Sequence, residues 1–439
     1  MSKAFSKSYL MAFYRSLKNQ YRYPAFRTMG IYAITGFFGK GLSFLLLPLF
    51  TNPKYLTPAD NGLLSLFSQA IIFLTPFVSL GVLQSTSVDF FKLDKKSFKD
   101  FCTTGLTMAV VMSGFSFAAF YIFRDFLFQR FSFPVTFIWA IPLLTLLVFL
   151  YEFVMLIIRN RNNAMTYARI NVTKITMELG LAVLFIVLLA WGWRGRVAGI
   201  LIATSLVALY GIYFLVRNDY LFGAVRRKII YSELQFSVPV VTMQISMFCL
   251  FSSDSFLLAG ITKNNAQVGI YGMACIFGSI IITLCSAIIQ YMVPKINQAL
   301  SAARIDYAAL GNQLLIYVSI MVFAFVTLLF LVPLAYHLFI NENYWPGIRY
   351  YFFISAGYFF WTISYFLYTF LFYHKRKRLL FSLAAVSIII STTSNYFFIT
   401  RFSALGAAIS VCCIYFIVML LAIIATGNYW KPIFHSHKE

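Results

Sequence analysis

Long apolar runs recur along the whole chain, and short polar stretches separate them. Most runs exceed 20 residues, which is enough for a helix to cross a hydrocarbon core about 30 Å thick. The short alternating segments of a transmembrane β-barrel are not seen. We therefore predict an all-α polytopic membrane protein with about 12 transmembrane helices. The predicted spans are 28–52, 62–90, 98–123, 133–158, 168–191, 197–216, 234–260, 268–294, 310–338, 348–372, 379–400 and 404–426.

Composition supports the membrane assignment and fixes the orientation. The chain has 439 residues, of which 61% are hydrophobic and 11% charged, a balance too apolar for a water-exposed surface. The net charge of +22 raises the alternative of nucleic-acid binding. However, 25 of the 35 Lys and Arg residues fall in, or within two residues of, the two tails and the even-numbered loops, and 8 fall in, or within two residues of, the odd-numbered loops. This bias predicts that both termini are cytoplasmic, with no nucleic-acid partner.

Little in the sequence suggests a catalytic or metal centre. The six cysteines form no CxxC pair, and the four histidines lie at span ends or in the C-terminal tail, so we expect no metal and no cofactor. The connections between spans are too short to hold a catalytic domain. This argues against a membrane enzyme of glycan assembly and favours a transporter over an enzyme.

Two motifs recur at the same offset, which indicates an internal duplication. Gly62 and Gly269 each open a helix after a polar loop, and they are 207 residues apart; Gly199 and Gly406 have the same spacing. We predict two six-helix lobes related as a parallel repeat, about an axis along the membrane normal. The expected segments are an N-terminal cytoplasmic tail (1–27), an N-lobe (28–217), a cytoplasmic linker (218–233), a C-lobe (234–426) and a C-terminal cytoplasmic tail (427–439).

Six stretches of the chain carry a family resemblance: "GKGLSFLLLPLFTNPKYLTPADNGLLSLFSQAI" (39–71), "SLGVLQSTSVDFF" (79–91), "YSELQFSVPVV" (231–241), "SSDSFLLAGI" (252–261), "VGIYGMA" (268–274) and "ALGAAIS" (404–410). Together they resemble the polysaccharide-transport flippases, a family that includes the O-antigen flippases. The same superfamily holds the multidrug and toxic-compound exporters and the lipid II flippase. Two positions depart from the family pattern: Asn61 replaces a common aromatic residue, and Ser255 replaces a common arginine.

The resemblance implies a V-shaped pair of lobes around a central cavity, working by alternating access. It implies transport of an undecaprenyl-diphosphate-linked oligosaccharide, such as an O-antigen unit, from the inner to the outer leaflet of a bacterial inner membrane. Membrane lipids, protons or Na⁺, and other polysaccharide assembly proteins are the further partners that it suggests. A cation-coupled multidrug exporter of the same superfamily remains the nearest alternative.

Five charged residues lie inside the predicted spans and away from their ends, where a charge costs several kcal/mol and usually has a function. They are Lys40, Glu152, Lys174, Glu178 and Asp254. Glu152 and Lys174 both lie about 9 Å from the cytoplasmic ends of their spans, so an ion pair between them is expected. Lys40 lies about 18 Å deep, where its side chain cannot reach either interface. The Lys40 ammonium is expected either to form an ion pair with Glu178 or to line a water-filled cavity, and we favour the cavity.

These charges suggest two roles in a flippase. Lys40 and Lys174 are the candidate ligands of the diphosphate, because ammonium groups bind phosphate as compact point charges. Glu152, Glu178 and Asp254 are candidates for ion coupling or for ion pairs within a cavity. The two glutamates also leave the multidrug exporter as an alternative, since such a protein would use acidic side chains to bind cationic drugs.

Glycines and prolines within the spans are candidate hinges or gates. Gly36, Gly39 and Gly41 surround Lys40 and allow close helix packing or bending. Pro48 and Pro239 each remove a helical hydrogen bond, which membrane helices tolerate. These five positions are therefore candidate hinges or gates, with a role in helix packing as the alternative.

Overall fold

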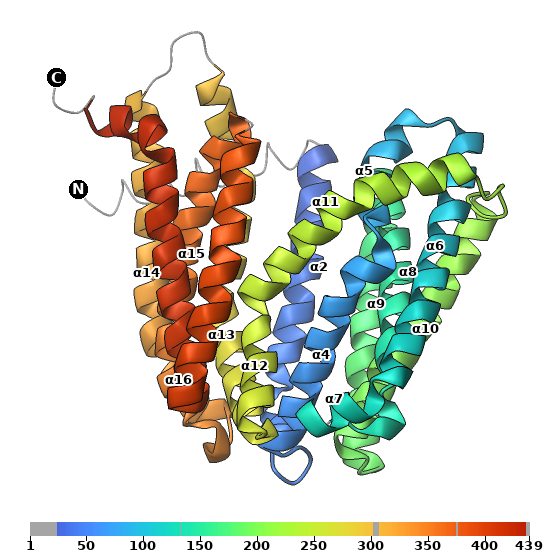
Figure 1. Ribbon diagram of the computed structural model, residues 1–439, viewed down its shortest axis with the longest axis horizontal. Helices are drawn as coiled ribbons and strands as arrows, with labels where there is room; N and C mark the ends of the chain where they lie inside the picture. Colours follow the sequence, from blue (N-terminus) through green and yellow to red (C-terminus); the bar gives the residue numbers. More distant parts are fainter. Residues whose placement is uncertain (1–23, 132, 302–306, 375, 436–439) are drawn as a thin grey trace, which may run out of the picture. The chain divides into compact units, whose positions relative to one another are not determined.

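The computed structural model describes residues 24–131, 133–301, 307–374 and 376–435, and these ranges contain helices and no strand (Figure 1). In this part of the chain, nine helices are long and apolar enough to cross a membrane. One of them contains two of the predicted spans, because α16 (Lys377–His435) continues through Ser403. The prediction of an all-α, multi-pass membrane protein is therefore confirmed.

Helices are present at each of the twelve predicted spans. Three short elements lie in the connections: α7 (Arg124–Phe131), η1 (Val135–Phe137) and η3 (Glu342–Tyr344). The elements at the spans are α2 (Pro24–Leu45) with α3 (Leu47–Phe50), α4 (Pro58–Ser79) with α5 (Val82–Lys92), α6 (Lys95–Ile122), α8 (Ala140–Asn160), α9 (Ala164–Val183) with the π-helix η2 (Leu184–Leu188), α10 (Gly192–Arg217), α11 (Arg227–Phe251) with α12 (Ser253–Thr262), α13 (Asn265–Leu300), α14 (Tyr307–Phe339), α15 (Gly347–Tyr373) and the two parts of α16.

Local backbone conformation explains where spans are interrupted. Leu80 and Gly81 have φ of 45° and 75°, which ends α4 and restarts the helix as α5. Ser403 has φ of 51° and ψ of −129°, so α16 is broken where the eleventh and twelfth spans meet. Positive φ is incompatible with a continuing right-handed helix, so each position separates two helical segments.

The chain divides into two compact units. Unit 1 comprises Met1–Leu47, Leu74–Ala119 and Trp139–Val241. Unit 2 comprises Pro48–Phe73, Phe120–Ile138 and Thr242–Glu439. These segments do not coincide with the N-lobe and C-lobe predicted from the duplication, which stay a prediction.

The core of unit 1 is an aromatic and aliphatic cluster between α5, α6 and α8. Phe98 and Phe101 of α6 and Phe149 and Phe153 of α8 are almost completely buried in it. Helices α2 and α10 both pack closely against α9. This packing brings the polar residues of three spans together, as described below.

In unit 2, the two glycines of the first repeated motif meet directly. A Cβ atom on Gly62 would lie 1.8 Å from the Asn265 carbonyl oxygen, and one on Gly269 would lie 2.0 Å from the Pro58 carbonyl oxygen. Only glycine allows this backbone approach. Asn61, which precedes Gly62 and departs from the family pattern, donates a side-chain hydrogen bond to the Phe50 carbonyl at 2.8 Å.

Candidate functional site

A network of charged side chains lies inside unit 1, between α9 and α10. The Lys174 ammonium contacts one carboxylate oxygen of Glu178 at 3.2 Å, and the Arg196 guanidinium contacts the other at 3.3 Å. All three side chains are less than 20% exposed. One carboxylate thus serves two cations, and the network carries a net positive charge.

An aromatic ring extends this network towards α8. The Lys174 ammonium lies 5.1 Å from the centre of the Tyr151 ring, a distance that allows a cation–π interaction. The Tyr151 hydroxyl donates to the side-chain oxygen of Asn171 at 3.3 Å. These contacts hold Lys174 between a carboxylate and an aromatic face.

The expected ion pair between Glu152 and Lys174 is not formed. Lys174 pairs instead with Glu178, one helical turn along α9, and Arg196 binds the same carboxylate. Within the described part of the chain, Glu152 has no ion pair shorter than 4 Å. Its side chain lines a cavity of about 210 Å³.

Sequence reasoning missed Arg196, which it placed in a loop between two spans. The structure begins α10 at Gly192, so Arg196 lies one turn inside the helix and its side chain is mostly buried. The tight connection between η2 and α10 directs this side chain back along α9. A signal was available, because residues shortly after such a connection lie beside the last turns of the preceding helix.

The helix that carries Lys40 packs against the helix that carries the network. A Cβ atom on Gly39 would lie 2.6 Å from the Ile175 side chain, so α2 and α9 approach closely at this point. Gly36 and Gly41, by contrast, have open space beside their Cα atoms. Of the three glycines around Lys40, Gly39 is the one with a close neighbour at its Cβ position, and that neighbour is the terminal methyl group of the Ile175 side chain.

Asp254 belongs to the other unit and forms a separate buried site. It lies in the first turn of α12 and is 6% exposed. Its carboxylate accepts hydrogen bonds from the Tyr271 hydroxyl and from the backbone N–H of Ser255 at 2.7 Å. No Lys, Arg or His pairs with it among the residues that the structure describes. Ser255, which replaces the common arginine, thus supplies a neutral donor.

The two candidate hinge prolines lie where the chain passes from one compact unit to the other. Pro48 is the first residue of a unit 2 segment and follows the break between α2 and α3 at Leu46. Pro239 lies inside α11, two residues before unit 1 ends at Val241. Missing hydrogen bonds at these places make bending easier.

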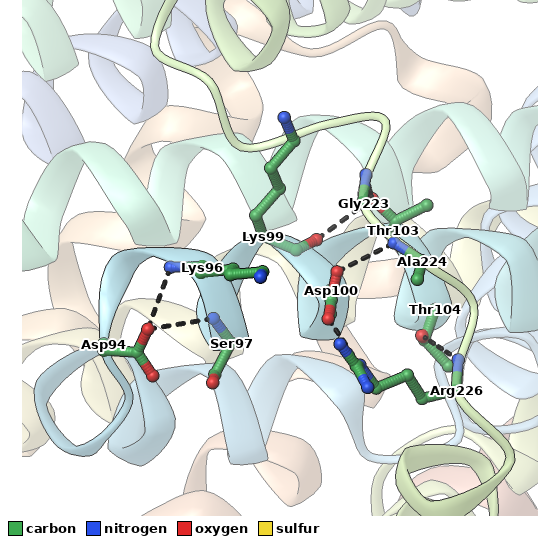
Figure 2. Close-up of polar contacts among 10 residues, drawn as sticks. All are labelled: Asp94, Lys96, Ser97, Lys99, Asp100, Thr103, Thr104, Gly223, Ala224 and Arg226. Carbon is green, nitrogen blue, oxygen red and sulfur yellow. Dashed lines mark hydrogen bonds and ion pairs between the residues drawn. The ribbon is translucent and has the colours of Figure 1, made fainter.

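The connection between α10 and α11 is held on α6 by a group of contacts that sequence reasoning did not identify (Figure 2). The buried carboxylate of Asp100 accepts hydrogen bonds from the Ala224 backbone N–H at 2.7 Å and from the Arg226 guanidinium. The Gly223 N–H donates to the Thr103 hydroxyl at 2.9 Å. We call this set of contacts the linker clamp.

Two aspartates outside the spans add to the polar surface near the clamp. The Lys99 ammonium donates to Asp219 at 2.6 Å and holds the pKa of that carboxyl below its ordinary value. Hydrogen bonds from Ser97 lower the pKa of Asp94 in the same way. A lowered pKa means that the stabilisation from Asp219 is present at neutral pH and lost as the pH falls through its folded-state pKa.

Replacing Asp100 by alanine is expected to release the linker. The Ala224 N–H would lose its acceptor, and the Arg226 guanidinium would lose an ion pair that contributes little because the Arg226 side chain is half exposed. The measurement is the rate of trypsin cleavage after Arg226 in the purified protein, which should rise. The Asp100→Asn variant keeps an oxygen acceptor, so its cleavage rate should rise less. Equal, unchanged rates for both variants would mean that the clamp does not hold the linker.

Comparison with known proteins identifies the family. The sequence profile of the family described as "Polysaccharide biosynthesis protein" matches residues 26–300. The chain belongs to this family. A search of curated protein sequences found no match.

Solved structures with a similar fold include a multidrug resistance transporter and a lipid II flippase. An inward-facing multidrug resistance MATE family transporter of the MOP superfamily has a TM-score of 0.68 and 13% identity, covering 88% of this chain and 95% of its own. The lipid II flippase MurJ, in an inward closed conformation, has a TM-score of 0.71 and 14% identity, covering 90% and 87%. At these identities the likeness shows the fold alone.

Proposed function

We propose that this family member is a flippase for an undecaprenyl-diphosphate-linked oligosaccharide, with an O-antigen or related surface polysaccharide unit as cargo. The observation that carries the proposal is the sharing of Glu178 by Lys174 and Arg196 inside membrane-spanning helices. A net positive charge in such a place is costly, so a negatively charged ligand is its simplest explanation.

The chemistry of the cargo fits this charge. A diphosphate is a polyanion that cannot enter hydrocarbon unaided. Lys174 and Lys40 would act as point charges, and Arg196 would add a planar fork of donors. Movement of each negative charge out of a negative interior would be favoured by about 2.3 kcal/mol per 100 mV. Binding therefore needs to be only strong enough to bring the headgroup into the protein.

The mechanism that we propose is alternating access of two lobes in a bacterial inner membrane, with both termini in the cytoplasm. Pro48 and Pro239 support it, because they lie where the chain passes between compact units. The linker clamp would keep the start of α11 attached to unit 1 while the rest of α11 bends. Gly36 and Gly41, which have open space around them, would let α2 adapt.

Ion coupling is assigned to the acidic residues. Asp254 is the best placed, because a buried carboxylate without a cationic partner gains from binding a proton or Na⁺. Glu178 is held by two cations and would respond to the arrival of the diphosphate, and Glu152 is the third candidate. Transport into vesicles that persists after both ion gradients are collapsed would exclude this role.

A multidrug exporter is the second candidate, favoured by the fold similarity to a MATE family transporter. The sharing of one carboxylate by two cations counts against it, because a cationic drug would be repelled. The choice between the two candidates is open to a direct genetic test.

The test is complementation of a bacterial strain that lacks its own lipid-linked-glycan flippase and carries the cognate glycan genes. We expect Lys40→Ala and Lys174→Ala to lower the amount of surface glycan at least about tenfold, a change of 1.4 kcal/mol. The conservative variants Lys40→Arg and Lys174→Arg should retain most of it. Lys228→Ala is the matched control, because Lys228 is an exposed lysine outside the network.

The outcomes separate the proposals, provided that all variants reach the membrane at equal levels. Full surface glycan in both alanine variants would leave a flippase in which these lysines have a structural role only. Failure of the wild-type protein to restore glycan, together with export of cationic dyes, would establish the multidrug exporter instead.

A further inference from the structure

A second polar region of unit 1 lies beside the charged network and is not explained by it. It is a cavity of about 210 Å³ between α5, α8 and α9. Its polar lining consists of Gln84, Ser87, Tyr151, Glu152, Arg159 and Tyr167. All of these residues belong to unit 1, so the cavity is built within one compact body.

Three of the lining side chains have unused hydrogen-bonding capacity. Gln84, Glu152 and Arg159 form no side-chain hydrogen bond and no ion pair shorter than 4 Å with the residues that the structure describes. Glu152 and Arg159 are two turns apart on α8, about 10 Å, so they lie at opposite ends of the lining. These three side chains line the cavity, and a polar ligand bound there would form hydrogen bonds with them.

The lining chemistry selects the class of ligand. Glu152 accepts hydrogen bonds, Arg159 donates them and Gln84 does both, while Tyr151 and Tyr167 offer apolar ring surface with a polar tip. A hydroxyl-rich ring with apolar faces satisfies this combination. A phosphate would be repelled by Glu152, and a cation would be repelled by Arg159.

The size of the cavity restricts the ligand further. Sites for drug-sized ligands are roughly 300–1,000 Å³, so a cavity of about 210 Å³ is too small for a typical drug or for several sugar residues. A single monosaccharide ring is the largest unit that suits it. The remaining sugars of an oligosaccharide would extend through the open side.

The position of the cavity agrees with the structure of the cargo. Tyr151 lines the cavity, and its ring also contacts the Lys174 ammonium of the charged network. A sugar in the cavity would therefore lie one side chain away from the proposed diphosphate site. In a lipid-linked glycan the first sugar is bonded directly to the diphosphate, so the two sites have the required order.

We propose that this cavity binds one pyranose ring of the glycan, and that Gln84, Glu152 and Arg159 recognise its hydroxyl groups. The proposal rests on the proposed flippase function, since that function supplies the glycan. A site that pairs these polar groups with sugar hydroxyls would also discriminate between glycans.

The experiment measures sugar binding by the full-length protein, purified in a detergent without a sugar headgroup. The probes are methyl pyranosides of a hexose, a 6-deoxyhexose and an N-acetylhexosamine, followed by saturation-transfer NMR. We expect at least one probe to bind, and its affinity to fall about tenfold or more in Gln84→Ala, Glu152→Gln and Arg159→Gln. Arg169→Gln is the matched control, because Arg169 is an exposed arginine of α9 outside the cavity.

The results distinguish this proposal from the function on which it rests. No binding by folded wild-type protein, or equal binding by all variants, would overturn the sugar site even if complementation succeeds. If sugar binding depends on the three cavity residues but the protein fails to restore surface glycan, the sugar site would be supported and the flippase function would be overturned. Lys174→Ala should still bind the probes, since they carry no phosphate.

Discussion

Replacing Glu178 by glutamine is expected to lower the free energy of unfolding by about 3–5 kcal/mol, because it leaves two mostly buried cations without their counter-ion. The carboxylate contacts Lys174 at 3.2 Å and Arg196 at 3.3 Å, so a single substitution removes both ion pairs. Glutamine keeps the shape of the side chain, which restricts the change to charge. The measurement is the apparent melting temperature of the purified protein in detergent.

Glu152→Gln is the matched control for this substitution. Glu152 is a second glutamate in the same unit, but it has no ion pair shorter than 4 Å with any described residue. Its substitution should therefore change the melting temperature little. A Glu178→Gln protein as stable as the wild type would mean that Lys174 and Arg196 do not depend on this carboxylate.

Replacing Gly62 by alanine is expected to destabilise the protein at least as strongly as overpacking usually does, by about 3 kcal/mol or more. The new methyl group would lie 1.8 Å from the Asn265 carbonyl oxygen, which belongs to backbone and cannot rotate away. Gly269→Ala should behave similarly, since its Cβ would lie 2.0 Å from the Pro58 carbonyl oxygen. Melting temperature and the yield of folded protein are the measurements.

Gly114→Ala is the control for the glycine substitutions. Gly114 lies within α6, and a methyl group added there would have no neighbouring atom within 4 Å, so alanine should be neutral or stabilising by up to about 1 kcal/mol. Equal stability of the Gly62→Ala and Gly114→Ala proteins would show that the close crossing between α4 and α13 does not form.

The fold class and the membrane spans followed from the sequence, because they depend on properties that are local in the chain. A span needs only about 20 consecutive apolar residues, and each predicted span contains a helix. The repeated glycines were also visible, although their direct contact was not. The family resemblance, carried by short motifs, was confirmed by the match to residues 26–300.

The spacing of Lys174 and Glu178 by four residues is visible in the sequence, whereas the choice of this pair over Glu152 and Lys174, and the contact with Arg196, were decided by the tertiary structure. Depth along a helix placed Glu152 and Lys174 at one level, but it did not give the rotation of each helix or the side chains of its neighbours. Arg196 reaches Glu178 because the connection before α10 is tight, and Asp100 holds the linker because Ala224 and Arg226 fold back onto α6. Hydrophobic length is a property of one segment, whereas a polar contact requires two segments to be packed in a defined orientation.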